Sequence, residues 1–172
     1  FQNHSEWGPR ALGNRSILFD PRILDGKDII NNVKKREWYR PLSGTIMLEY
    51  ANDYFEMLTI KESPYMSFAI KAKQKAIETV PSIVHKDGTS RIQTVTEKQN
   101  KNYYELIKSF YERTNVPILL NTSFNLAGEP IVETFEHAIK TINNSNIDYL
   151  YLPHGKIQYE YTECSHCGHI EL

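Results

Sequence analysis

Residues 118–130 read ILLNTSFNLAGEP, a short apolar run that turns abruptly polar. The apolar part is entered through Pro117 and predicts a buried strand. The amide and hydroxyl residues that follow, and then Gly128 and Pro130, are typical of a loop. Small polar side chains at the mouth of a buried strand are what an α/β protein uses to hold a polar ligand. An ordinary polar turn is the alternative interpretation.

Length and composition limit what the chain can be. Its 172 residues, 40% of them hydrophobic, are enough for one core, so we expect one domain over 1–160 and a Cys/His-containing tail over 161–172. The net charge of −1 gives no overall basic field, which makes nucleic acid an unlikely partner.

The sequence also predicts where the protein works. No apolar run is long enough to cross a membrane, and no signal peptide opens the chain. The two cysteines, both near the C-terminus, favour a reducing cytoplasm over a secreted, disulfide-bonded domain. Because the chain begins at Phe1 inside a dense polar motif, we expect it to have been cut from a longer protein.

Alternating strands and helices predict a mixed α/β domain with a twisted sheet. Besides the strand at 118–120, we expect strands at 17–19, 45–48, 65–71, 81–85, 91–95 and 148–152. Helical spacing of apolar residues predicts helices at 28–33 and 102–113, and a third that Thr134 can cap. Residues 49–56 are consistent with a short helix or a lid.

The densest group of cations lies in residues 33–42, VKKREWYRPL. Such a run is usually a solvated surface, but aromatic residues and Pro41 interrupt this one. If the segment were a strand, alternation would send Lys34, Arg36 and Arg40 to one side. Three converging cations exceed what one ion pair needs, so we predict a phosphate site here.

Two other segments carry candidate ligand residues. Residues 6–16, EWGPRALGNRS, place Arg10 and Arg15 among glycines, which suits an anion, although solvated loop arginines would look the same. In residues 85–95, an Asp-Gly turn predicts a hairpin that brings His85 near Arg91 and Gln93. The paired Arg91 and Gln93 are the better ligand candidates, because a lone histidine beside a turn is usually structural.

The tail holds Cys164, Cys167 and His169. A Cys-x-x-Cys pair is half of a tetrahedral zinc site, and His169 could add a third ligand. A tail that binds metal adventitiously explains the pattern equally well, so no metal site is assigned.

In their order, residues 6–16, 34–41, 85–93 and 121–125 resemble the motifs of the C-terminal domain of the NodU-type O-carbamoyltransferases. The resemblance extends from about Glu6 to Leu152. The Lys-x-Arg at Lys34 and the Ser-x-Asn at Ser123 are also similar to signatures of YrdC-like threonylcarbamoyl-adenylate synthases. Ser43 departs from the pattern, because the family usually has a second proline in this loop.

The resemblance implies a YrdC-like fold and a defined reaction. In that family this domain forms carbamoyl-adenylate from ATP and carbamoyl phosphate, with Mg2+ expected as the ATP complex. A Kae1-like domain, N-terminal in the same parent chain, then transfers the carbamoyl group to the hydroxyl of a small molecule or glycan. That partner domain is not among these residues, so we expect that the chain alone cannot complete the transfer.

The resemblance and the charges together suggest roles for ten residues. Adenylation needs phosphate charges to be positioned and neutralised, and needs no protein nucleophile. We expect Lys34, Arg40 and Arg91 to be catalytic. We expect substrate or nucleotide to be bound by Arg10, Arg15, Arg36, His85, Asn121, Ser123 and Asn125.

Two alternatives remain open from the sequence. The chain could be a threonylcarbamoyl-adenylate synthase-like enzyme that uses threonine and bicarbonate, although the opening motif favours the carbamoyltransferase. It could also be a non-catalytic nucleotide- or RNA-binding module, which the near-neutral charge disfavours.

Overall fold

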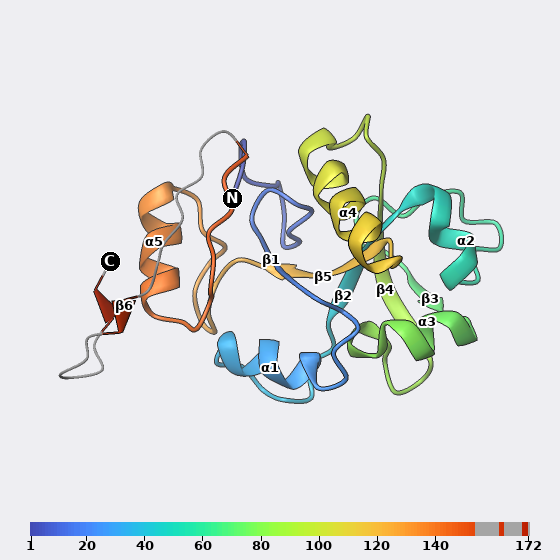
Figure 1. The fold of residues 1–172 in the computed structure, drawn as a ribbon, viewed down its shortest axis with the longest axis horizontal. Helices are drawn as coiled ribbons and strands as arrows, with labels where there is room; N and C mark the ends of the chain where they lie inside the picture. The colour runs from blue at the N-terminus through green and yellow to red at the C-terminus, as the bar shows by residue number, and fades with distance from the viewer. Residues whose placement is uncertain (154–161, 164–169, 172) are drawn as a thin grey trace.

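A computed structural model describes residues 1–153, 162–163 and 170–171 of the protein. Its centre is an open five-stranded sheet in the order β1-β5-β2-β4-β3 (Figure 1). Strands β2 and β4 are parallel, and the other neighbours are antiparallel. The strands are β1 Ser16–Phe19, β2 Ser43–Met47, β3 Ala69–Lys71, β4 Thr89–Val95 and β5 Ile118–Ser123. The predicted mixed α/β class is confirmed.

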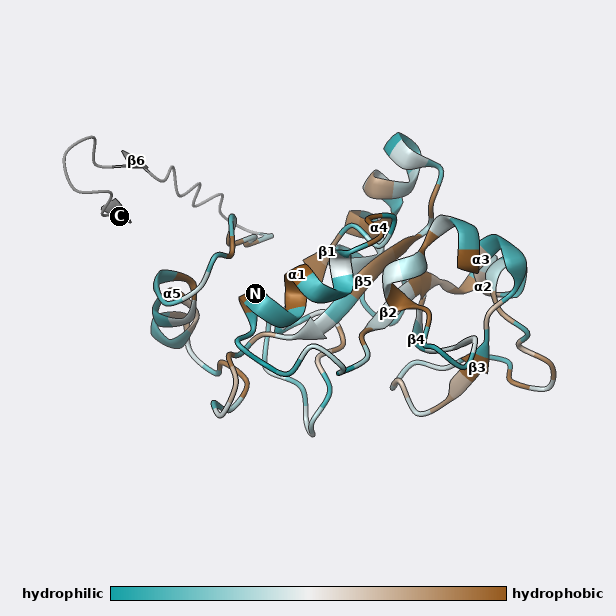
Figure 2. Ribbon diagram, turned by 90° about the horizontal axis from the view of Figure 1, so that it is seen from below, coloured by the Kyte–Doolittle hydropathy of each residue, from teal (hydrophilic) through white to brown (hydrophobic). Residues whose placement is uncertain are grey.

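Helices cover both faces of this sheet. Helix α1 (Gly26–Val33), helix α3 (Gln74–Thr79) and the 3-10 turn η2 (Pro81–Ile83) contribute to the core on one face, and α4 (Lys101–Thr114) packs on the other. The short η1 (Leu48–Tyr50) and α2 (Ala51–Tyr54) follow β2 directly. Helix α5 (Phe135–Asn143) lies beyond the β1 edge in both ribbon views (Figures 1 and 2). A separate pair, β6 (Thr162–Glu163) and β7 (Ile170–Glu171), lies in the tail.

Alternation along β5 builds two cores. Ile118 and Leu120 face the larger core, which also contains Ile30 of α1, whereas Leu119 faces a smaller core with Tyr103 and Ile107 of α4. Figure 2 shows the hydrophobic colour along β5, which lies between β1 and β2 in the sheet. A strand buried on both faces is a near-continuous apolar run, which is why 118–120 was recognisable from sequence.

The two helices with the clearest periodicity form as predicted. Asn100 caps α4 by accepting a hydrogen bond from the amide of Tyr103 at 3.2 Å, and Asn115 ends the helix in the left-handed conformation at φ 58°. Thr134 caps α5 through the amide of His137 at 3.3 Å. Helix α1 begins two residues before its predicted start.

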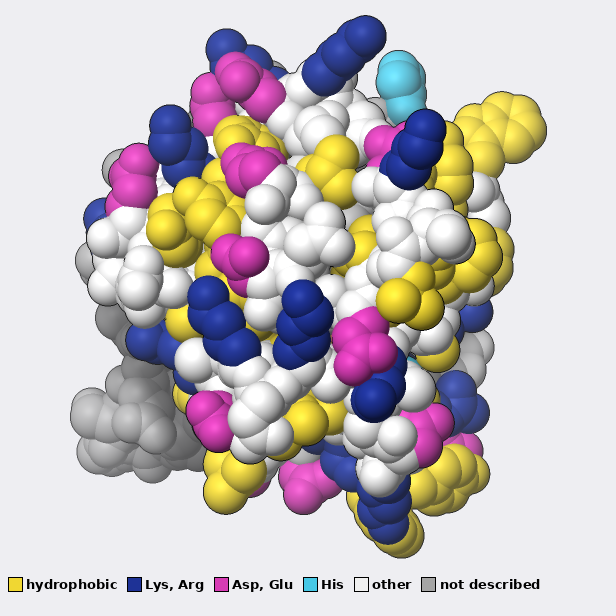
Figure 3. Space-filling view, turned by 90° about the vertical axis from the view of Figure 1, so that its right-hand side faces the viewer, with side chains coloured by type: hydrophobic (Ala, Val, Ile, Leu, Met, Phe, Trp, Pro, Cys, Tyr) yellow, Lys and Arg dark blue, Asp and Glu magenta, His cyan; other side chains and the backbone are white. Residues whose placement is uncertain are grey.

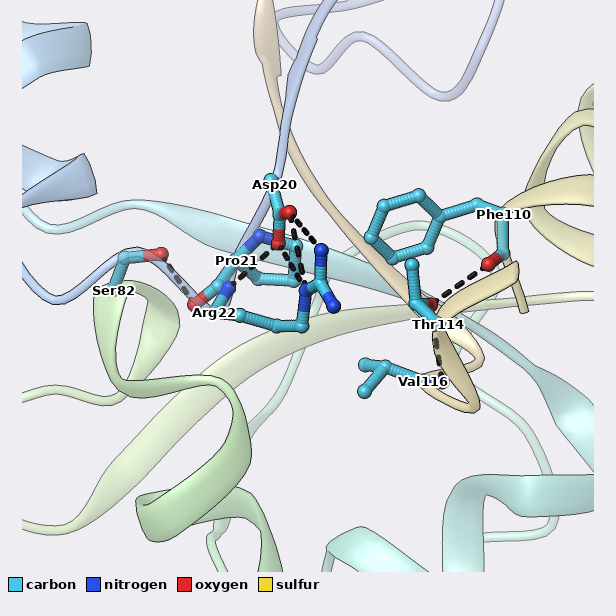
Figure 4. A network of polar contacts seen from close by, with 7 residues as sticks. All are labelled: Asp20, Pro21, Arg22, Ser82, Phe110, Thr114 and Val116. Atoms are coloured by element: carbon cyan, nitrogen blue, oxygen red, sulfur yellow. Dashed lines mark hydrogen bonds and ion pairs between the residues drawn. The ribbon is translucent and has the colours of Figure 1, made fainter. Parts of the chain in front are cut away.

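The loop after β1 connects opposite sides of the sheet (Figure 4). Arg22 forms a 2.6 Å ion pair with Asp20 and lies 5.5 Å from the ring of Phe110 on α4. On the other side, the Ser82 hydroxyl of η2 donates to the carbonyl of Pro21 at 3.0 Å. The loop after β1 therefore contacts α4 on one face of the sheet and η2 on the other.

Three predicted strands are wrong in whole or in part. Residues 81–83 form a 3-10 turn instead, because Pro81 starts it and Ile83 packs against Gly44 of β2. Residues 148–152 are irregular, since no neighbouring strand pairs with them among the described residues. Only the last three residues of 65–71 are β3.

Other expectations are settled or lie outside the described residues. The ambiguous segment 49–56 contains the end of η1 and the short helix α2. The boundary at 160, and the candidate metal ligands Cys164, Cys167 and His169, lie outside the part of the chain that the structure describes. No helix within the described residues has the length and hydrophobicity needed to cross a bilayer.

Candidate anion-binding site

Polar side chains gather where β2, β4 and β5 lie side by side. Ser43 pairs with Asn121 across β2 and β5, and Arg91 of β4 donates from Nε to the Ser43 hydroxyl at 2.9 Å. Two residues further along the same face, Gln93 accepts a 2.8 Å hydrogen bond from Thr45. As predicted, Arg91 and Gln93 point the same way, but Gln93 is buried and only Arg91 lines a cavity.

Two adjoining hollows open at this end of the sheet. The smaller, of about 70 Å3, is lined by Arg10, Arg36 and Arg91 among others. The larger, of about 570 Å3, is lined by the cations of residues 34–40 and by the loop after β5. Arg36 and Ser123 line both, so the two hollows meet there.

The arginines of the smaller hollow repel one another, and no acidic residue in the described part of the chain lines that hollow. Burial, and then the charges of Arg40 and Arg91, lower the pKa of Arg36, and nearby Glu37 opposes this shift only in part. Burial, and then Arg10, lower the pKa of Arg91. Among the described residues neither Arg36 nor Arg91 forms an ion pair with a carboxylate. Converging cations of this kind favour a bound anion.

One guanidinium nitrogen is free to bind such an anion. Arg36 is fixed by a 2.6 Å hydrogen bond from Nε to Asn31 Oδ1, yet its Nη2 is buried without a hydrogen-bond partner. An unsatisfied buried donor is costly, so its presence in a cavity wall points to a missing acceptor. Arg40, by contrast, is exposed and pairs with Glu37 at 2.6 Å.

Lys34 lies in the wall of the larger hollow and is only 2% exposed. Its ammonium donates to the backbone carbonyl of Ser123, to the Ser123 hydroxyl at 3.1 Å and to Asn125 Oδ1 at 3.0 Å. Burial, and then the charge of Arg36, lower the pKa of Lys34 to about 7. The two motifs that hold the lysine and the serine are thus in direct contact.

The cations of 34–40 converge for a different reason from the predicted one. The segment is not a strand: Lys34 ends helix α1 and Lys35 takes a left-handed φ of 52°. Asn31 then donates to the carbonyls of Trp38 and Arg40, both at 3.1 Å, and so holds the loop against the helix. A helix end and its loop, rather than alternation, bring the cations together.

Two of the predicted site residues lie elsewhere. Arg15 is buried and donates to the carbonyls of Gln2, Asn14, Asn3 and Glu133 at 2.6 to 3.1 Å, and it lines neither hollow. The expected hairpin has no first strand, so His85 contacts Thr89 and the carbonyl of Leu42 instead of approaching Arg91. Arg15 organises the N-terminal segment, and His85 supports the loop before Ser43.

Asn121 lines the smaller hollow but has a second task. Its amide nitrogen donates to the carbonyl of Ala11 at 3.2 Å and to Thr45 at 3.0 Å, and Gln93 donates to Leu12 at 3.0 Å. These bonds hold the N-terminal segment over the sheet, which places Arg10 at the hollow. Asn121 Oδ1 is buried and without a partner.

Sequence reasoning missed Asn31 and Ser43. Asn31 is completely buried in a short helix with an otherwise apolar inner side, which is the signal that could have identified it. Ser43 was noticed only as a departure from a pattern, whereas it accepts the hydrogen bond that orients Arg91.

The fold and the site together define an open mixed α/β domain with two adjoining hollows lined by converging cations. Residues 1–158 match the family described as Carbamoyltransferase C-terminus. Since that match covers most of the chain, the protein belongs to this family.

Named relatives agree with the family assignment. The chain is 46% identical over 151 residues to nodulation protein NolO of Bradyrhizobium diazoefficiens, covering 87% of this chain and 28% of that protein. It is 47% identical over 151 residues to nodulation protein NolNO of Sinorhizobium fredii, covering 87% and 22%. It is 38% identical over 124 residues to nodulation protein U of Rhizobium tropici, covering 72% and 21%. The chain therefore spans about a quarter of the length of these relatives.

Proposed function

We propose that this chain is the adenylate-forming part of an O-carbamoyltransferase and makes carbamoyl-adenylate from ATP and carbamoyl phosphate. The observation that carries the proposal is the group of arginines that converges on the smaller hollow, with the buried, unpartnered Nη2 of Arg36 at the junction of the two hollows. Membership in the carbamoyltransferase family supplies the reaction class.

The proposed reaction balances with one water. Water releases carbamate and phosphate from carbamoyl phosphate, and a carbamate oxygen then attacks the α-phosphorus of ATP. The new bond joins that oxygen to the α-phosphorus, and the bond to the bridging oxygen breaks as pyrophosphate leaves. Because the charge on phosphate oxygens must be neutralised throughout, positioned arginines can supply most of the catalysis.

The sizes of the hollows suggest how the substrates divide. A space of about 70 Å3 between Arg91 and Arg36 suits a group of a few heavy atoms, such as carbamate or phosphate. The 570 Å3 hollow, with Arg36 and Arg40 in its wall, suits the triphosphate and ribose of ATP. The reacting α-phosphate would then lie at Arg36, where the hollows meet.

Other parts of the reaction come from outside the described residues. Mg2+ would arrive with ATP, because no group of three or more potential ligand residues in the described part of the chain could hold a metal. A Kae1-like domain, N-terminal in the parent protein, would pass the carbamoyl group to a hydroxyl of a small molecule or glycan. The length of the relatives beyond the matched region is consistent with such a domain. The reducing cytoplasm would be the place of the reaction.

Pyrophosphate release tests the proposal directly. The chain is incubated with ATP and Mg2+, with and without carbamoyl phosphate, beside Arg40→Ala and a matched Arg113→Ala control. Arg113 is an exposed arginine near the end of α4, whereas Arg40 lines the larger hollow. We expect release that requires carbamoyl phosphate, falls at least tenfold in Arg40→Ala and is unchanged in Arg113→Ala.

The same assay separates the alternatives. Release that requires threonine and bicarbonate would assign the chain to the synthase class, which the small hollow disfavours because a threonine is much larger than a carbamate. Failure to release pyrophosphate with any of these substrates, while ATP still binds, would contradict the adenylation proposal for this chain and leave a nucleotide-binding module.

A further inference from the structure

The hydrogen-bonding capacity of Lys34 is already used within the protein. An ammonium group has three N–H donors, and the structure gives Lys34 Nζ three acceptors, all in the Ser123–Asn125 turn. None of these acceptors is a carboxylate, so the contacts do not neutralise its charge. Lys34 lines the larger hollow, but it is only 2% exposed and its donors already point into the turn.

The backbone of Lys34 makes a further connection to the same loop. Its carbonyl accepts a 2.9 Å hydrogen bond from the amide of Ala127. Lys34 is also the residue at which α1 ends. The side chain and the backbone carbonyl of Lys34 therefore both join the end of α1 to the loop that follows β5.

The Ser123–Asn125 turn, which Lys34 contacts, also has hydrogen bonds of its own. The Ser123 hydroxyl donates to Asn125 Oδ1 at 2.6 Å, and Asn125 Nδ2 donates to the carbonyl of Glu129 at 2.7 Å. Since a serine has one O–H, its oxygen can offer an incoming ligand only acceptor capacity in this arrangement. The unpartnered donor at the junction is Arg36 Nη2.

We infer that Lys34 is a positioning residue: its ammonium fixes the Ser123–Asn125 turn, and Arg36, two residues later, contacts the phosphate. The lysine and the arginine of the Lys-x-Arg pair thus have separate tasks, one inside the protein and one toward the ligand. This inference refines the role that the sequence suggested for Lys34. The identity of the ligand rests on the proposed function, but the task of Lys34 in the ligand-free chain does not.

Amide hydrogen exchange in the ligand-free chain tests the internal task. Lys34→Met keeps an unbranched chain but removes the donors, and Arg36→Met is the matched control. We expect amides in residues 123–127 to exchange at least tenfold faster in Lys34→Met and at the wild-type rate in Arg36→Met. Unchanged exchange in Lys34→Met would overturn the inference.

A double-mutant cycle on pyrophosphate binding tests the ligand side. If Lys34 acts through Asn125, the variant Lys34→Met/Asn125→Ala should bind pyrophosphate no more than about twofold more weakly than Lys34→Met. Arg36→Met/Asn125→Ala should show the product of the two single losses. Additive losses in the lysine cycle would show instead that Lys34 contacts the anion itself.

This design distinguishes failure of the inference about Lys34 from failure of the proposed function. If Lys34→Met does not fold, Asn125→Ala carries the exchange test, since it removes one of the three acceptors and should speed exchange in the same amides. Unchanged exchange there would contradict the inference. If the wild-type chain binds neither pyrophosphate nor ATP, the proposed function fails, while the exchange result still decides the role of Lys34.

Discussion

Arg15 and Arg36 show that an arginine removed from solvent can stabilise the fold or bind a ligand, depending on the hydrogen-bond partners of its guanidinium. Both arginines have one buried nitrogen without a partner, but the Arg15 guanidinium donates to four backbone carbonyls, whereas the Nη2 of Arg36 lies beside two other arginines at a cavity wall. Arg15→Ala should lower the free energy of unfolding by roughly 3 kcal/mol, because it leaves buried carbonyls unpaired. Arg36→Ala should change stability by less than about 1 kcal/mol, because the loss of one hydrogen bond is offset by relief of repulsion.

For pyrophosphate binding, the two variants should rank in the opposite order. We expect Arg36→Ala to weaken pyrophosphate binding at least tenfold, and Arg15→Ala, which acts only through the N-terminal segment that carries Arg10, to weaken it by less. Urea denaturation of both variants measures the free energy of unfolding, and calorimetric titration measures their affinity for pyrophosphate. If folded Arg15→Ala lost as much pyrophosphate affinity as Arg36→Ala, Arg15 would have to contact the anion itself.

Lys34 should make stability depend on pH in a defined direction. Its pKa is about 7 in the folded chain, compared with an ordinary value of 10.5. Below pH 7 both states hold the proton and the full cost of burying the charge is present. Between pH 7 and 10.5 only the unfolded chain holds it, so this residue makes stability rise with pH by at most about 1.4 kcal/mol per unit.

The difference between wild type and Lys34→Met isolates this effect. Lys35, Arg36, Glu37 and Arg40, which line the same hollow, are present in both chains, so their own contributions cancel in the comparison. Urea unfolding at pH 6, 7, 8 and 9 should give a free-energy difference that is flat up to about pH 7 and then grows in favour of the wild type. Parallel curves across the whole range would contradict the lowered pKa.

At the scale of elements, the N-terminal segment depends on a close contact with α4. Gly13 has a φ of 113°, and a Cβ there would lie 2.3 Å from the ring of Tyr103, which is buried on α4. Gly8 has a similar φ of 107° but nothing within 4 Å of such a Cβ. Gly8→Ala should therefore cost only backbone strain, about 1–3 kcal/mol, and Gly13→Ala a further 1–3 kcal/mol from overpacking.

Thermal unfolding and pyrophosphate binding of the two glycine variants check this prediction. Because the segment delivers Arg10 to the smaller hollow, Gly13→Ala should also weaken binding, whereas Gly8→Ala should not. Equal destabilisation by the two changes would mean that the contact with Tyr103 does not hold the segment in place.

Elements with a strong local signal were predictable, and those that depend on a neighbour were not. The amphipathic α4 and the doubly buried β5 carry their pattern within the segment itself. Residues 148–152 have the composition of a strand but no partner strand among the described residues, and Pro81 turns the next residues into a 3-10 turn against Gly44. Pairing and packing partners are set by the tertiary structure, which local propensity does not contain.

The site was predictable as chemistry more than as geometry. The cations at 34–40, Arg91 and Ser123 do line the hollows, because charge and small polar residues are visible in the sequence. That Arg15 bonds to carbonyls rather than to a ligand follows from long-range contacts, such as the one with Glu133, 118 residues away. Asn31 was missed because its importance depends on the fold of the loop it supports.

At the scale of the whole molecule, cationic residues do not outnumber acidic ones, but several of them converge on one site. The chain has 20 lysines and arginines against 21 acidic residues, yet three arginines share a hollow of about 70 Å3. Figure 3 shows the face on the side of α2 and α3, where cationic and acidic side chains are interspersed. A focused cationic site attracts a small multivalent anion, whereas a long polyanion needs an extended basic surface.

We therefore expect the chain to distinguish ATP from RNA. At physiological salt, a 20-nucleotide single-stranded RNA should bind no more tightly than the non-specific range of about 10⁻⁴ M, and Arg36→Met should not change that value. ATP should bind more tightly and lose affinity in Arg36→Met. Fluorescence anisotropy for RNA and calorimetry for ATP, each at 50 and 200 mM salt, make the comparison. Tight RNA binding that falls steeply with salt and disappears in Arg36→Met would mean that the arginine cluster holds a nucleic-acid backbone, and the enzyme proposal would lose its site.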